Sequence, residues 1–162
     1  MIDNTDTQIL TLLQQNARIS NAEIARQVGM APSAILERIR KLETSGVIRG
    51  YEARIDPEAL GLSLLAFVFV RSNDLVGDTS TAELLARIPE VQEAHHIAGE
   101  DCFLLKVRVP DAKSLGRLLR ERIGVLGTVR STRTTIVLET VRESAQVPLL
   151  PALEEVAHAG AD

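Results

Sequence analysis

The chain has 162 residues and a formal net charge of −4 at pH 7, from 18 Lys and Arg against 22 Asp and Glu. This length allows one domain or two small ones. The acidic balance argues against a uniformly basic surface that binds nucleic acid, but it permits a local basic patch. The single cysteine, Cys102, excludes an intrachain disulfide and a cysteine-rich zinc site, and the 2% aromatic content argues against stacking on unpaired bases.

The polar and acidic start of the chain carries no signal-peptide pattern. No apolar run reaches the ~18 residues that a membrane helix needs. We therefore expect a cytoplasmic protein without membrane contact.

Residues 3–15 are predicted to form the first helix, because apolar residues recur along them with helical spacing. Asp3 or Thr5 can cap its start, since either side chain can accept a hydrogen bond from the free N–H groups of the first turn. Its broad apolar face consists of Ile9, Leu10, Leu12 and Leu13. We expect this face to pack across the next two helices and to complete a three-helix core.

A second helix is predicted over residues 21–28, with Ser20 or Asn21 as its cap. Gly29 is expected to end it, because glycine tolerates the left-handed backbone that follows a helix. Pro32 then suits the first turn of a third helix, where a missing N–H costs little.

The third helix is predicted to run from Pro32 to about Ser45 and to stop at Gly46. Its apolar stripe, at i, i+4 and i+7, is formed by Ile35, Ile39 and Leu42. The remaining face has small residues at its start and charges beyond, which suits a helix that enters the major groove of DNA. The predicted DNA-contacting residues are Ser33, Ala34, Glu37, Arg38, Arg40 and Lys41. On spacing alone, an ordinary helical hairpin with a solvated face remains the alternative.

A strand is predicted over residues 47–55 from their alternation, with Arg49, Glu52 and Arg54 placed to face water. Asp56 and Pro57 break this strand, and a short turn ends at Gly61. We place the domain boundary at this turn.

The first half of the chain carries a long set of spaced motifs. They are Asp6, Ile9 and Leu10, Asn16-Ala17-Arg18, Arg38-Ile39, Leu42-Glu43, Gly46-Val47-Ile48, Gly50-Tyr51 and Gly61. In these motifs residues 9–61 resemble the N-terminal half of the Lrp/AsnC (feast/famine) family of bacterial and archaeal transcription regulators. The resemblance extends to about Arg142, and it implies a DNA-binding helix-turn-helix followed by a ligand-sensing domain.

The second half of the chain changes to strand spacing, beginning with a continuous apolar run. Its predicted elements are a strand at 64–70, a helix at 81–88, strands at 91–97 and 102–109, a helix at 112–123 and a strand at 129–141. This order is the split βαβ arrangement, so we predict an α+β protein with a winged or three-helix helix-turn-helix domain and a ferredoxin-like βαββαβ domain.

One face of the predicted sheet is expected to take both helices. The other face still carries Phe67, Phe69 and Leu105, so it needs a cover. A second copy of the same sheet is the simplest cover and produces a two-fold dimer.

The residues that could suggest a metal site are His95 and His96 with Cys102, Glu100 and Asp101. Adjacent strand residues point to opposite faces, so the two histidines are badly placed for one ion, and the spacing matches no common zinc pattern. Cys102 stands beside acids, and the sequence has no evident catalytic triad, Cys-His pair or phosphate loop. We predict no metal, no cofactor and no catalytic residue, and hence no enzyme.

The loop at Gly99, Glu100 and Asp101 combines a glycine that lets a ligand approach the backbone with carboxylates that can hold an ammonium. From the residues alone, a plain hairpin turn with solvated acids is the simpler interpretation. The family resemblance implies a ligand-sensing (RAM) domain that binds small effectors, usually amino acids, between dimers of a ring. It places the effector-binding residues at His96, Gly99, Glu100, Asp101, Cys102, Thr134 and Thr135.

The loop departs from the family pattern at Cys102, where many relatives carry an acid, because the acids here fall earlier. A thiol cannot accept the charge-assisted bond that a carboxylate accepts from an ammonium. We therefore expect an effector that is unusual, weakly bound or absent, with Ala112 and His96 setting its side-chain preference.

The sequence as a whole predicts a sequence-specific transcription regulator whose partners are double-stranded DNA and a small effector, an amino acid or a related molecule. The predicted domains are a helix-turn-helix domain with its linker strand at 1–60, an effector-binding and oligomerisation domain at 61–145 and a tail at 146–162. The resemblance implies a homodimer that assembles further, as far as an octamer. The alternative is a nucleoid-type architectural DNA-binding protein without an effector.

Overall fold

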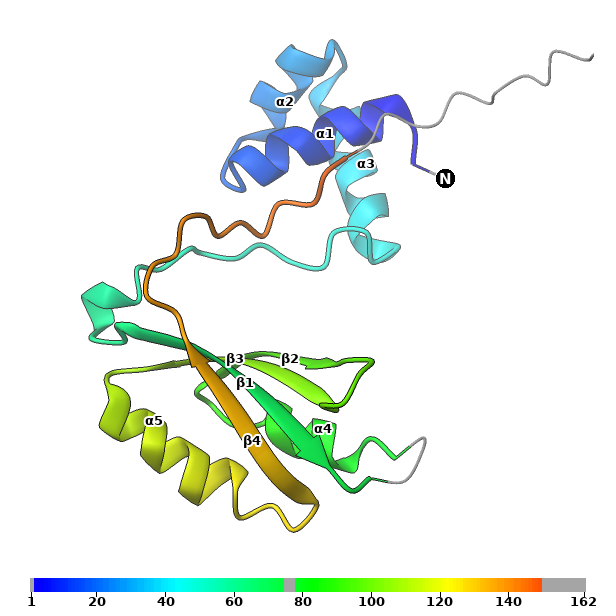
Figure 1. Cartoon of the computed structure of the whole chain (residues 1–162). Coiled ribbons are helices and arrows are strands. Elements are labelled where there is room, and N and C mark those ends of the chain that lie inside the picture. Colours follow the sequence, from blue (N-terminus) through cyan, green and yellow to red (C-terminus); the bar gives the residue numbers. More distant parts are fainter. Residues whose placement is uncertain (1, 75–77, 150–162) are drawn as a thin grey trace, which may run out of the picture. The chain divides into compact units, whose positions relative to one another are not determined.

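The computed structural model of the protein describes residues 2–74 and 78–149 (Figure 1). The chain forms two compact units. The first contains the residues up to Arg54 and the segment that begins at Ser144, and the second runs from Ile55 to Glu143. Most of the predicted tail lies outside the described residues, and the predicted domain limits at 60/61 and 145/146 stay predictions.

Three helices make up most of the first unit: α1 (Asn4–Gln15), α2 (Asn21–Val28) and α3 (Pro32–Thr44). Asp3 caps α1, since its carboxylate accepts a hydrogen bond from the backbone N–H of Asp6 at 2.7 Å. The hydroxyl of Ser20 accepts one from the backbone N–H of Glu23 at 3.2 Å and caps α2. Gly29 ends α2 with a left-handed φ of 75°. The three predicted helices are confirmed.

The core of the first unit is built from one apolar face of each helix. Its buried residues are Ile9, Leu10, Ile24, Ala25, Ile35, Ile39 and Leu42. Leu149 packs against the same core from far along the chain. The side-chain amide of Gln14 holds the adjoining segment, because it accepts from the N–H of Val147 at 2.7 Å and donates to the carbonyl of Val147 at 3.1 Å. Residues 144–149 are thus an integral part of this unit.

The second unit has the order strand, helix, strand, strand, helix, strand. Its elements are η1 (Glu58–Leu60), β1 (Leu64–Ser72), α4 (Ser80–Ala86), β2 (Val91–His96), β3 (Phe103–Val109), α5 (Ala112–Leu118), the π-helical turn η2 (Leu119–Ile123) and β4 (Val129–Ile136). The strands pair antiparallel in the order β2-β3-β1-β4 (Figure 1). The predicted ferredoxin-like βαββαβ fold is confirmed.

The helices α4 and α5 cover one face of this sheet. Alternate residues of each strand point to the same side, so one set of strand residues faces these helices. That helix-covered face carries the buried residues Ala66, Val68, Val70, Phe103, Leu105, Val107 and Val109. The prediction that Leu105 lies on the uncovered face is wrong: this side chain is fully buried, and its neighbour Leu104 points to the uncovered face instead. Phe67 and Phe69 do lie on the uncovered face, where both are half-buried.

Two predicted strand limits are also wrong. Residues 47–55 form no strand, because no other backbone segment in the described part of the chain pairs with them. The last strand ends at Ile136 and not at Val141, since its partner β1 begins at Leu64. The N–H of Val137 still bonds the carbonyl of Leu65 at 2.9 Å, and only Leu64 of β1 lies beyond this point.

We predict that Leu105→Ala lowers the free energy of unfolding by about 2–5 kcal/mol, because it leaves a cavity in a core that has no exposed surface at this position. Leu104→Ala is the matched control, since this side chain is only half-buried. Chemical denaturation followed by circular dichroism measures both at several protein concentrations. If both variants lost the same free energy of unfolding at every protein concentration, the assignment of Leu105 to the buried face of β3 and Leu104 to the uncovered face would be wrong.

Candidate functional site

The exposed side of α3 carries the side chains that the sequence singled out for DNA contact. Ile35, Ile39 and Leu42 are buried on the opposite side. The residues Ser33, Glu37, Arg40 and Lys41 are exposed, and Ala34 is half-buried beside them. The small residues Ser33 and Ala34 stand at the N-terminal end of this face, where a helix backbone can approach base edges most closely.

Arg38 differs from the other predicted DNA-contacting residues, because its guanidinium is bound to α1. It donates to the carboxylate of Asp3 at 2.7 Å and to that of Asp6 at 2.8 Å. These hydrogen bonds, to Asp3 and then to Asp6, raise the pKa of Arg38. The backbone N–H of Asp6, followed by the Arg38 guanidinium, lowers the pKa of Asp3. Arg38 therefore joins α3 to the capped start of α1, and its contact with DNA stays a prediction.

A second polar contact holds the chain just beyond α3. The hydroxyl of Tyr51 donates to the carboxylate of Glu43 at 2.9 Å. Burial, and then the hydrogen bond and charge of Glu43, raise the pKa of Tyr51 to about 12. This residue stays a neutral donor at physiological pH, and it fixes the segment that leaves the helix.

In the second unit, the loop between β2 and β3 is held by arginines from two other strands. Arg71 of β1 donates to the backbone carbonyl of Glu100 at 3.1 Å and lies 3.3 Å from its carboxylate. Arg133 of β4 donates to the carboxylate of Asp101 at 3.0 Å. The Arg133 guanidinium also lies over the ring of Phe69, 3.9 Å from its centre. The sequence placed Arg133 in a strand segment that resembles the family's effector site, but it predicted neither arginine as a partner of the loop acids, because their strands are distant in the chain and only the sheet brings them to this loop.

Cys102 has a different role from the two acids that precede it. Its sulfur accepts a hydrogen bond from the backbone N–H of Ser72 at 3.4 Å and lies 3.8 Å from the carbonyl oxygen of Ser72. The side chain is half-buried at the end of β1. Cys102 thus links the start of β3 to the end of β1 beside the loop.

The remaining predicted effector residues do not all lie on one face of the sheet. Thr135 pairs with Phe67 and so lies on the uncovered face, whereas Thr134 pairs with the buried Val68 and lies on the helix-covered face. His96 pairs with Phe103 and stacks on its ring, with ring centres 5.2 Å apart. Gly99 makes the loop turn at a φ of 146°.

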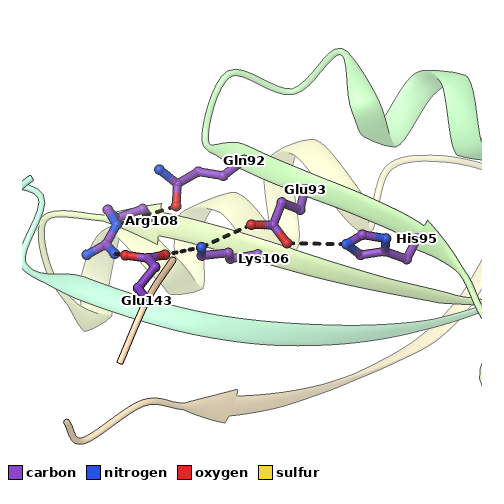
Figure 2. A network of polar contacts seen from close by, with 6 residues as sticks. All are labelled: Gln92, Glu93, His95, Lys106, Arg108 and Glu143. Carbon is purple, nitrogen blue, oxygen red and sulfur yellow. Dashed lines mark hydrogen bonds and ion pairs between the residues drawn. The ribbon is translucent and has the colours of Figure 1, made fainter. Parts of the chain in front are cut away.

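The uncovered face of the sheet also carries a network of charged side chains (Figure 2). Lys106 donates to the carboxylates of Glu93, at 3.0 Å, and of Glu143. Arg108 lies 3.7 Å from Glu143, and His95 lies 3.3 Å from Glu93. Burial opposes the charge of Lys106, but its hydrogen bonds to the two carboxylates outweigh burial and raise its pKa. The same bonds to Lys106 lower the pKa of Glu93 and of Glu143.

Residues 2–74 and 78–149 contain no group of three or more His, Cys, Asp or Glu side chains placed to hold a metal ion. No helix within them is long and apolar enough to cross a membrane.

Both units match known protein families. Residues 2–43 match the AsnC-type helix-turn-helix domain, and residues 65–147 match the Lrp/AsnC ligand binding domain. The chain is 41% identical over 147 residues to the Leucine-responsive regulatory protein of Escherichia coli strain K12, and the match covers 88% of each chain.

Solved structures of the same kind are also similar over most of their length. A transcriptional regulator of Neisseria meningitidis in complex with L-methionine has a TM-score of 0.86 and 29% identity, over 92% of this chain and 97% of that one. The feast or famine regulatory protein of Mycobacterium tuberculosis, complexed with L-methionine, has a TM-score of 0.84 and 37% identity, over 91% and 99%. AsnC of Escherichia coli has a TM-score of 0.84 and 30% identity, over 91% and 99%.

We predict that Arg38→Gln lowers the midpoint of thermal unfolding, because it leaves the carboxylates of Asp3 and Asp6 without the guanidinium that joins the two helices. Arg40→Gln is the matched control on the same helix, since Arg40 is exposed on its outer side. Differential scanning calorimetry measures both variants. An unchanged midpoint for Arg38→Gln would show that the ion pairs of Arg38 with Asp3 and Asp6 contribute nothing to stability.

We predict that the network around Glu143 makes stability depend on acid pH. The folded pKa of Glu143 lies below its ordinary value of 4.5, so the carboxylate stabilises the fold above that pH, and the stabilisation is lost as the pH falls through the folded pKa. Urea denaturation at pH 6, 5, 4 and 3 should therefore show a steeper loss of stability for the wild type than for Glu143→Gln. The matched control is Glu139→Gln, an exposed acid on the same segment, which should keep the wild-type slope.

Proposed function

This chain belongs to the Lrp/AsnC family of transcriptional regulators, and from that premise we propose that its first unit reads a specific DNA sequence while its second unit binds a free amino acid. The DNA-reading half of the proposal rests on one observation, the exposed outer face of α3 in the helix-turn-helix formed by α2 and α3. We propose that it works in the cytoplasm, because a transcription regulator acts where the DNA is.

The proposed reading of DNA follows from the side chains on α3. Ser33 and Ala34 are small enough to bring the start of the helix against base edges in the major groove. Glu37 accepts hydrogen bonds and so suits the amino group of a cytosine. Arg40 and Lys41 carry positive charge on the same exposed face and suit phosphates, which fix the register of the protein on the duplex.

The proposed assembly is a two-fold dimer through the uncovered face of the sheet. Phe67, Phe69 and Leu104 lie half-buried on that face and lose further apolar surface when a second copy covers them. A two-fold dimer presents two copies of α3, so its DNA site is expected to be roughly palindromic, with half-sites one or more helical turns apart. Dimers assembled further into a ring, up to an octamer, would bend or wrap DNA around several such sites.

The effector half of the proposal is supported by what relatives bind. The regulators of Neisseria meningitidis and Mycobacterium tuberculosis were both solved with L-methionine, and the Escherichia coli relative is named for its response to leucine. A bound amino acid can shift this protein between two arrangements only by the difference in its affinity for them. The relatives are regulators, and we assign no catalytic role to any residue.

We predict that Arg40→Ala weakens binding to every DNA sequence and reduces the dependence of log affinity on log salt by about 0.9, the value of one lost phosphate contact. Glu37→Ala should instead relax the preference at one base pair, by roughly 5- to 150-fold for a contact worth 1–3 kcal/mol. Fluorescence anisotropy with the promoter of its own gene, with single-base variants of it and with unrelated DNA measures both effects.

Two results of this experiment would overturn the DNA-reading proposal. Equal affinity for promoter and unrelated DNA would favour an architectural protein that coats DNA without an effector. Binding that is insensitive to salt would exclude phosphate contacts altogether, because these must release counterions. A preferred sequence that is unchanged in Glu37→Ala would place the groove-facing side of α3 elsewhere.

A further inference from the structure

Arg38 stands in the middle of a stripe of α3 that otherwise belongs to its DNA-facing side. Ala34, Arg38 and Lys41 follow one another at i, i+4 and i+7, so they lie along one side of the helix. Lys41 is exposed and Ala34 is half-buried, whereas the guanidinium of Arg38 turns to the start of α1. A hollow of about 310 Å³ beside it is lined by Asp3, Asp6, Ala34, Glu37, Arg38 and Lys41. Two acids of α1 therefore border the same hollow as residues that are predicted to contact DNA.

The contact between Arg38 and α1 uses every carboxylate oxygen of Asp3 and Asp6. Oδ1 of Asp3 accepts from the backbone N–H of Asp6 at 2.7 Å, and Oδ2 of Asp6 accepts from the backbone N–H of Asp3 at 3.2 Å. Nη1 of Arg38 donates to the two remaining oxygens, Oδ2 of Asp3 at 2.7 Å and Oδ1 of Asp6 at 2.8 Å. A side chain of α3 thus completes the capping box at the start of α1. We call these three side chains the α1–α3 clasp.

The α1–α3 clasp is poorly suited to bind a phosphate. One guanidinium faces two carboxylates, so the clasp has more negative than positive charge. A phosphate that took Arg38 would replace two charge-assisted hydrogen bonds with one contact and would bring a third anion beside the two carboxylates. It would also leave the carboxylate of Asp6, which is only 13% exposed, without its cation. We therefore expect Arg38 to stay bound to Asp3 and Asp6 when α3 meets DNA.

The clasp holds α3 on a side that the apolar core does not reach. Ile35 and Ile39 are buried on the inner side of the helix, and the clasp adds a polar contact at its flank. A helix held on two sides resists rotation about its own axis. Rotation of α3 would carry Ser33 and Glu37 away from the base edges that they are proposed to meet, because side chains that read a surface need a fixed support.

We propose that Arg38 is a positioning residue of the DNA-reading unit: through Asp3 and Asp6 it sets the rotation of α3 against α1. This role takes the place of the DNA contact that the sequence predicted for Arg38. The proposal rests on the proposed DNA-reading function and names a contact that supports it. Removal of the clasp then costs preference for a particular DNA sequence, whereas removal of a phosphate contact costs affinity for every sequence.

Fluorescence anisotropy with the promoter of its own gene and with unrelated DNA tests this role on the full-length protein at several salt concentrations. The measured quantity is the promoter preference, which is the ratio of the two affinities. A loss of folded protein lowers both affinities by the same factor and leaves this ratio unchanged, so the ratio separates positioning from stability. Circular dichroism at the assay temperature establishes that each variant is folded.

We expect Arg38→Gln to lower the promoter preference about fivefold or more, which is the low end of the discrimination that one base contact provides. The dependence of log affinity on log salt should stay at the wild-type value. Arg40→Gln is the matched comparison on the same helix, since it should reduce this dependence by about 0.9 on both DNAs and keep the preference. Arg87→Gln removes an exposed arginine of the second unit and should change neither quantity.

The acids of α1 provide a second test, in which the two roles of Arg38 predict different results. The double variant Asp3→Asn, Asp6→Asn keeps a good helix cap, because asparagine caps a helix as well as aspartate does. If Arg38 bound a phosphate, loss of two negative charges beside it would strengthen binding to both DNAs equally. If Arg38 positions α3, the double variant should lower the promoter preference, as Arg38→Gln does.

Combined variants show whether these residues act as one unit. Arg38→Gln together with Asp3→Asn and Asp6→Asn should lower the promoter preference no further than Arg38→Gln alone, because both changes break the same contact. Arg38→Lys keeps the charge but loses the planar fork that reaches both carboxylates, so its preference should fall between those of Arg38→Gln and the wild type.

The outcomes distinguish failure of this inference from failure of the proposed function. If the wild type prefers its promoter, but Arg38→Gln or the double variant of the two acids keeps that preference, the inference is wrong while the DNA-reading function stands. A salt dependence reduced by about 0.9 in Arg38→Gln, with both affinities lowered equally, would assign Arg38 to a phosphate and would also overturn it. If the wild type binds promoter and unrelated DNA equally, the DNA-reading proposal fails and this inference fails with it.

Discussion

The two-residue period of the strands is the constraint on which the second unit depends. Burial of alternate residues of β1 and β3 against α4 and α5 turns every intervening residue to the uncovered face. That face accordingly holds Phe67, Phe69 and Leu104 beside a charged network centred on Lys106. A shift of one residue in register would exchange these two sets, which is why the apolar core and the candidate ligand-binding face are determined together.

The segment after β4 connects the two compact units, and polar contacts hold both of its ends. Glu143, the last residue of the second unit, is bonded to Lys106 on the sheet (Figure 2). Val147, in the first unit, is paired through its backbone with the side chain of Gln14 on α1. Each of these contacts joins residues that are far apart in the chain. A change at the charged network therefore acts next to the point at which the chain enters the DNA-binding unit.

Local patterns were sufficient for much of the fold. The caps Asp3 and Ser20, the end at Gly29 and the helical stripes follow from interactions within one or two turns, and all were predictable. Strand limits were not, because a strand ends where its partner ends. Residues 47–55 alternate like a strand but lack a partner in the described residues, and β4 stops at Ile136 because β1 begins at Leu64.

The sequence by itself determined the element order, the outward face of α3 and the family, since these depend on composition and on spacing along the chain. Only the tertiary structure decided the partners of individual charges. Arg38 has two acids of α1 beside it, and Arg133 meets Asp101 over the ring of Phe69. The residues of each pair lie more than thirty positions apart in the chain. Arg133 and Asp101, for example, are separated by 32 positions. Their geometry depends on how helices cross and strands pair, and no local pattern encodes it.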